Sequence, residues 1–155
     1  MKITHKVLLQ TKRYVLSALL GACIIGGTLV VQGGETVPYK SNVAGQMTLK
    51  SDGGFKIEET GIGAHLGKFK LVGETDDKGI LWFTLTAANG DEAFGFLIDA
   101  AVDLSWVKLV IYDGTGRFEG STGIIDAFVA MDRSTLSYTG VGTGSISTVG
   151  STKNP

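Results

Sequence analysis

The sequence has few of the residues that crosslink a chain or interrupt its regular structure. Its 155 residues include one cysteine, Cys23, two prolines and two histidines. A single cysteine excludes an internal disulfide, so burial and backbone pairing have to hold the fold. Only one histidine, His65, lies beyond the N-terminal segment, so we expect no metal site and no cofactor. The low proline content and 43% hydrophobic residues argue against a disordered chain.

Acidic residues are missing from the first 33 positions, which differ from the rest of the chain. An apolar run over residues 14–31 follows four basic residues, which are Lys2, Lys6, Lys12 and Arg13. A basic start followed by a hydrophobic stretch is the layout of a secretory signal. We therefore predict a signal peptide or membrane anchor over residues 1–33, a folded domain over residues 34–148 and a flexible tail over residues 149–155.

Three fates of the N-terminal segment stay open. Cleavage after Gly33 would release the domain. The run from Leu20 to Cys23 resembles the lipobox of bacterial lipoproteins, in which the cysteine is lipidated. The apolar run is also long enough to stay as an uncleaved membrane anchor. Each fate exports the domain, so we expect a secreted, periplasmic or cell-envelope protein that meets a membrane only through this segment.

Basic residues are scarce in the rest of the chain. Residues 34–155 keep ten of the 14 basic residues and all 15 acidic ones, which gives a net charge of about −5. Binding to a phosphate backbone depends on clustered lysine and arginine. We therefore expect no nucleic-acid partner.

Beyond residue 34, apolar and polar residues alternate with the period of a β-strand. Eight such runs are separated by short polar turns, and none of them keeps a helical period for ten residues. The runs cover residues 43–50, 55–61, 65–74, 80–88, 94–103, 106–112, 124–131 and 135–148. This pattern predicts an all-β fold, an eight-stranded antiparallel up-and-down barrel. At this size the interior is either filled or holds one small ligand.

A glycine-rich stretch from Asp113 to Gly123 joins the sixth and seventh runs. Because glycine permits φ > 0 and close approach of chains, we interpret the stretch as a corner between two strands. Phe118, at its centre, is expected to pack against the end of the barrel. The residues that we assign to this structural motif are Gly114, Gly116, Phe118, Gly120 and Gly123.

Residues 114–123 resemble the Gly-Thr/Ser-Gly-x-Phe-x-Gly-x-x-Gly signature of plant dirigent proteins and allene oxide cyclases. The strand and hairpin at Gly63–Gly67 and Ala87–Asp91 also resemble those of small exported bacterial members of this barrel superfamily. The resemblance implies an eight-stranded antiparallel barrel and a homo-oligomer, a trimer or dimer. It further implies two activities to consider, isomerisation of a fatty-acid epoxide and steering of phenolic intermediates.

Two ionisable residues are candidates for catalysis. His65 is in phase with apolar residues of the third run and could act as a general acid or base at the barrel mouth, or be a structural histidine. Asp126 lies mid-strand, in phase with Ile124 and Phe128, and could face a pocket or belong to an ion pair. No residue is assigned a catalytic role on this basis.

Aromatic residues are the candidates for lining a ligand pocket, and they could equally fill the interior or an oligomer interface. The candidates are Phe69, Trp82, Phe94, Phe96 and Phe128. The sequence thus predicts an exported binding or scaffold module for a small apolar or aromatic molecule, without catalysis. The alternatives are an isomerase or cyclase that confines a reactive intermediate, and a structural cell-envelope lipoprotein.

Overall fold

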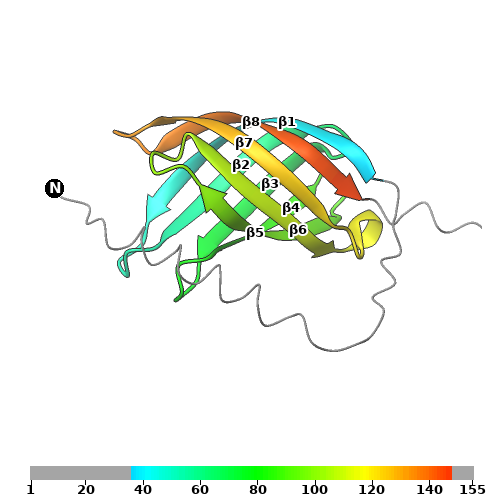
Figure 1. The fold of residues 1–155 in the computed structure, drawn as a ribbon, viewed down its shortest axis with the longest axis horizontal. Coiled ribbons are helices and arrows are strands. Elements are labelled where there is room, and N and C mark those ends of the chain that lie inside the picture. Colours follow the sequence, from blue (N-terminus) through cyan, green and yellow to red (C-terminus); the bar gives the residue numbers. More distant parts are fainter. Residues whose placement is uncertain (1–35, 148–155) are drawn as a thin grey trace, which may run out of the picture.

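The alternating runs form eight strands, each hydrogen-bonded to the next, and the last pairs with the first to close a barrel (Figure 1). The protein is represented by a computed structural model that describes residues 36–147. The strands are β1 (Thr36–Leu49), β2 (Phe55–Gly63), β3 (Gly67–Thr75), β4 (Leu81–Ala87), β5 (Glu92–Ala100), β6 (Trp106–Gly114), β7 (Gly123–Asp132) and β8 (Ser137–Ser147). All eight pairings are antiparallel, which confirms the predicted fold class.

The predictions for residues 1–33, including Cys23 as a lipidation site and cleavage after Gly33, lie outside the described residues. The same holds for the tail at residues 149–155. Within residues 36–147, no helix has the length and apolar character needed to cross a membrane.

Strand β1 begins at Thr36, seven residues earlier than the alternation predicted. It pairs with β8 from Thr36 opposite Ser147 to Gln46 opposite Ser137, whereas its pairing with β2 begins only at Ser41. The first residues of β1 are therefore paired with β8 alone, and the β2–β3 turn lies beside them. Pro38 lies in this overhang, where the missing N–H of a proline is tolerated.

Inside the barrel, aromatic rings lie over glycines of neighbouring strands. A Cβ atom at Gly45 would lie 2.5 Å from Cζ of Tyr138, and one at Gly61 would lie 2.5 Å from Cζ of Phe69. Phe83 lies against Gly95 in the same way. Each of these glycines has no side chain at the place where an aromatic ring lies across its strand. The rings therefore fit into the narrow interior.

The glycine-rich corner closes one end of the barrel. It contains a single 3₁₀ turn, η1 (Gly116–Phe118), which lies at the end where β1 begins and β8 ends (Figure 1). The Phe118 side chain is 1% exposed and packs with Leu66 and Ile146 around a residual void of about 10 Å³. This end is therefore plugged by side chains.

Polar contacts tie the corner to two other turns at the same end. The Arg117 side chain donates to the carbonyl oxygen of Leu66 at 3.3 Å, and its Nε lies 3.6 Å from Oδ2 of Asp91. The backbone N–H of Glu92 donates to Oγ1 of Thr115 at 3.0 Å. The corner thus links the β2–β3 and β4–β5 turns as well as joining β6 to β7.

We expect Gly116→Ala to destabilise the protein more than Gly53→Ala. Both glycines have positive φ, 56° and 87°, so both substitutions carry a backbone cost of about 1 kcal/mol. Only at Gly116 does the added Cβ also meet another side chain, the carboxyl of Asp91, whereas nothing lies within 4 Å at Gly53. Urea unfolding should show an additional loss of about 1–2 kcal/mol for Gly116→Ala. Equal losses for the two variants would contradict the structural role of the corner.

Candidate functional site

The barrel encloses a cavity of about 100 Å³ with a mostly apolar wall. All eight strands contribute to it, with side chains such as Ile57, Leu71, Leu85 and Ile125. The cavity extends away from the plugged end towards the opposite end of the barrel. There the lining residues are only half-buried, and they are Met47, Phe55, Leu97, Leu104 and Met131. This end is therefore the open mouth.

One carboxyl group, that of Glu59 on β2, lies in this apolar wall. Its side chain is half-buried and lines the cavity. The Tyr138 hydroxyl on β8 donates to Oε2 of Glu59 at 3.1 Å. Strand β1 lies between the two, and its residue at this level is Gly45, opposite both Glu59 and Tyr138. The absence of a side chain at Gly45 lets the Tyr138 ring reach across β1 to the carboxyl group.

Burial decides the ionisation of this pair. Loss of water around the carboxyl raises the pKa of Glu59 to about 7, although the Tyr138 hydrogen bond offsets part of the shift. Burial, and next the neighbouring carboxylate, raise the pKa of Tyr138 above its ordinary value. Glu59 is thus divided between its acid and carboxylate forms near neutral pH, whereas Tyr138 stays neutral.

Two further polar side chains, Tyr39 and Ser41 of β1, extend the polar part of the wall. Both are buried, at 5% and 3% exposure, and both line the cavity. Burial raises the pKa of Tyr39 to about 12, so its phenol also stays neutral. The cavity therefore combines one ionisable carboxyl, two neutral phenols and a hydroxyl with an apolar remainder. A site of this composition suits a small apolar molecule with one polar group.

Sequence reasoning missed Glu59, although a signal was present. Glu59 is in phase with Phe55 and Ile57, which face the interior, rather than with the outward Lys56 and Glu58. An acid in phase with the apolar face of a strand indicates a buried carboxyl. The contact with Tyr138 had no comparable signal, since the two residues are 79 positions apart.

Of the aromatic pocket candidates, Phe69 lines the cavity and the other four point outward. On β5 the inward residues are Ala93, Gly95 and Leu97, and the Phe83 ring occupies the interior beside Gly95. Phe94 and Phe96 therefore lie on the outer face. Phe128 is 54% exposed and also lies outside. The expectation that these side chains line an interior pocket is corrected accordingly.

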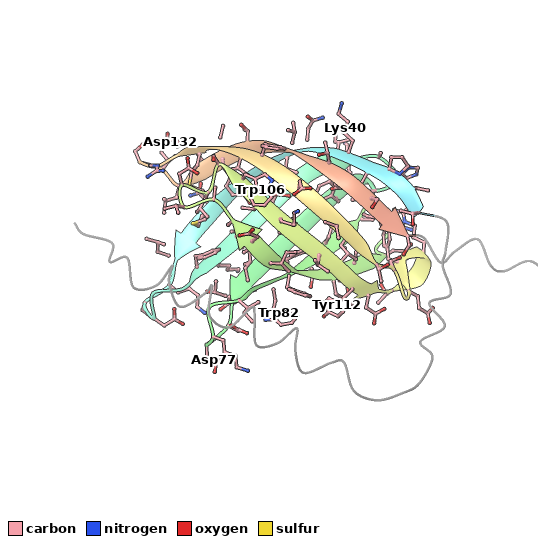
Figure 2. The ribbon with its side chains drawn as sticks, viewed as in Figure 1. Lys40, Asp77, Trp82, Trp106, Tyr112 and Asp132 are labelled. Atoms are coloured by element: carbon pink, nitrogen blue, oxygen red, sulfur yellow. The ribbon has the colours of Figure 1, made fainter. Side chains whose placement is uncertain are left out.

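Trp82 belongs to a cluster of rings on the outer wall (Figure 2). Its ring centroid lies 5.1 Å from that of Phe96 and 6.1 Å from that of Tyr112. The Trp82 indole N–H donates to Oδ2 of Asp76 at 3.0 Å. The outer wall of the barrel thus carries exposed aromatic side chains. The homo-oligomer expected from the sequence stays a prediction.

Neither catalytic candidate faces the cavity. His65 is exposed in the turn between β2 and β3 with φ of 64°, so it does not share the inward face of Phe69. Asp126 points outward, and its Oδ1 lies 3.5 Å from Nζ of Lys108. Asp126 shares a face with Ile124 and Phe128, as the sequence predicted. Both faces of β7 are apolar, however, and the face that points inward is that of Ile125 and Ala127. In the range that the structure covers, no cluster of three or more potential ligands could hold a metal ion.

Two solved structures share this architecture. The pterocarpan synthase dirigent protein PsPTS1 superimposes with a TM-score of 0.56 at 12% identity, over 76% of this chain and 97% of that one. The chain has the dirigent-type barrel fold. The pterocarpan synthase dirigent protein GePTS1 superimposes with a TM-score of 0.50 at 11% identity, over 74% of this chain and 86% of that one. No protein-family model matches the chain, and no curated protein matches its sequence. The similarity to dirigent proteins in these comparisons is therefore one of three-dimensional structure and not of overall sequence.

We expect Glu59→Gln to remove a pH-dependent cost in stability. The pKa of Glu59 is about 7 in the folded barrel and near 4.5 when the chain is unfolded. The folded state therefore holds more protons between these values, and stability falls as the pH rises from about 4.5 to 7. The full cost above pH 7 is about 3 kcal/mol at most.

Urea unfolding at pH 5, 6, 7 and 8 checks this expectation. The introduced glutamine keeps the shape of the side chain and carries no charge. The free energy of unfolding of the variant should therefore increase relative to that of the wild type as the pH rises to 7. Parallel stability profiles for the two proteins would show that the pKa of Glu59 is not shifted.

Proposed function

We propose that the protein is a binding module that holds one small apolar or aromatic molecule inside the barrel. The observation that supports this is the apolar cavity of about 100 Å³, plugged by Phe118 at one end and bordered by half-buried residues at the other. An engineered apolar cavity of about 150 Å³ is enough to bind benzene. The cavity here is smaller, so a single ring would fill it and extend into the open mouth.

The polar part of the wall supports recognition of one polar group on that molecule. Tyr138 donates its one hydroxyl proton to Glu59, so the pair offers acceptor oxygens to a bound ligand, and Glu59 offers a donor as well in its acid form. The remaining contacts are apolar and would contribute affinity through burial. A phenol, an aryl alcohol or a related small molecule fits this arrangement.

A second candidate is an isomerase or cyclase that moves a proton within the cavity. The observation that favours it is Glu59, whose pKa of about 7 suits a group that both accepts and donates a proton at neutral pH. The two similar solved structures are described as pterocarpan synthase dirigent proteins, which supports a synthase-type role on this fold. At 11–12% identity, this likeness transfers no residue role.

Filling the cavity should abolish binding. Ala127 on β7 lines the cavity, so Ala127→Leu places a larger side chain in the ligand space. Ala130 lies on the outer face of the same strand, so Ala130→Leu is the matched control. Titration of 2-phenylethanol, followed by amide chemical shifts, should give saturable binding to the wild type and to Ala130→Leu but not to Ala127→Leu. Equal binding to all three proteins would place the ligand outside the barrel.

The second candidate predicts proton exchange in a bound ketone. The benzylic protons of phenylacetone exchange through an enol, so a base and acid at Glu59 should accelerate their replacement by deuterium in D2O at pH 7. Acceleration of about 100-fold or more over buffer, lost in Glu59→Gln, would be in the range of general acid–base catalysis. If exchange proceeds at the rate of buffer alone while phenylacetone binds, the chain binds without catalysing this step.

A further inference from the structure

The cavity wall contains one acid and no base. Among the residues that line it there is no lysine, arginine or histidine, and Glu59 is the one carboxyl. An anionic ligand would therefore meet a like charge in an apolar environment with nothing to compensate it. This composition disfavours fatty acids and other carboxylates and favours neutral and cationic ligands.

The hydrogen bonding of Glu59 is incomplete. Tyr138 donates to Oε2, and no residue in the described range 36–147 donates a hydrogen bond to Oε1. The groups found around the carboxyl are Tyr138 of β8, which donates to it, Leu71, opposite Glu59 on β3, and Tyr39 of β1, whose pKa the Glu59 charge helps to raise after burial; none of them carries a positive charge. A buried carboxylate in this position lacks a counter-ion, and a cationic ligand would supply one.

Aromatic rings in the same wall add to the attraction for a cation. Tyr39, Phe69 and Tyr138 all line the cavity with Glu59. The face of an aromatic ring attracts an ammonium group, and the attraction grows when water is excluded. An acid combined with aromatic rings therefore favours an ammonium group over a neutral hydroxyl of the same size.

The turns around the open mouth carry an excess of negative charge. They hold four aspartates, Asp52, Asp76, Asp77 and Asp103, and Asp132 ends β7 beside them, against three bases, Lys50, Lys78 and Arg133. Four of the aspartates, Asp52, Asp76, Asp103 and Asp132, accept a hydrogen bond from the residue two positions further on. The pKa of each is below its ordinary value, so they stay ionised.

Position and pairing strengthen this charge pattern at the mouth. Asp77 and Asp132 lie at the end of the barrel away from η1 (Figure 2). Lys50 lies between two acids, with its Nζ 2.8 Å from Glu74 and 3.2 Å from Asp52, so these three residues together keep one negative charge. A mouth of this sign draws cations towards the cavity.

We infer that the ligand is a small apolar cation, an arylalkyl amine in chemical class, whose ammonium group pairs with the Glu59 carboxylate while its ring occupies the apolar part of the cavity. This inference rests on the proposed binding function and specifies its ligand. No covalent step is involved, and the ammonium takes the place of the proton that otherwise neutralises Glu59.

Three probes of similar size and different charge test the inference. Calorimetric titrations of 2-phenylethylamine, 2-phenylethanol and phenylacetate into the wild type at pH 8 and low salt should rank them amine, alcohol, then no binding. We expect the amine to bind at least about tenfold more tightly than the alcohol, as befits an ion pair shielded from water. Glu59→Gln should remove this preference. Glu58→Gln deletes the same charge from the outer face of β2 and should keep it.

If Glu59→Gln folds poorly, the pH dependence of ligand affinity in the wild type tests the same inference. The amine, like a lysine side chain, stays protonated between pH 5.5 and 8, while Glu59 passes from acid to carboxylate. Tyr39 and Tyr138 stay neutral in this range, since the pKa of each is raised. Amine affinity should therefore rise about tenfold or more with pH, and alcohol affinity should not rise.

The outcomes separate the ligand class from the binding function. If the alcohol binds as tightly as the amine, or if Glu59→Gln keeps the preference, the cationic ligand class is wrong and the binding function stands. If none of the three probes binds to the wild type, the proposed binding function fails together with the inference. If phenylacetate binds best, the inferred charge of the ligand is overturned.

Discussion

The interior of an eight-stranded barrel has room for the side chains of its own strands or for one small ligand, and this limit decides where the other features lie. Large rings fit because they lie over glycines, as Tyr138 does over Gly45 and Phe69 over Gly61. Where a ring has already taken the space, as Phe83 has beside Gly95, aromatic residues of the next strand are placed outside. The same limit keeps the remaining cavity to about 100 Å³.

A carboxyl group in such an interior is costly, and the barrel compensates it only in part. Tyr138 supplies one hydrogen bond to Glu59. It can reach Glu59 because Gly45, on the intervening strand β1, has no side chain in the way. The corner at the far end reduces the access of water, since Phe118 and Leu66 are almost fully buried there. The chain thus keeps a destabilising acid beside a void, which is the arrangement expected of a binding site rather than of a packed core.

The strands were predictable because alternation marks a half-buried strand in any context, and all eight were found. The inward face was not predictable on β5 and β7, where both faces are apolar and packing decides between them. For this reason Phe96 stayed a pocket candidate although it lies on the outer face, and Asp126 kept two alternatives, of which the ion pair is the one found. Glu59 could have been found from its phase with Ile57. Its contact with Tyr138 could not, because it depends on the register of both β2 and β8 against β1.

Closure of β1 on β8 also sets the order in which the protein can assemble. During synthesis β1 emerges first, but one of its two partners is the last strand to be made. Pairings between distant parts of a chain form slowly, and an unpaired strand edge invites association with other chains. The outward side chains of β1 include Lys40, Asn42 and Gln46, which discourage such association. Strand β1 is synthesised before its partner β8, and its polar outward side chains therefore limit its association with other chains until the barrel closes.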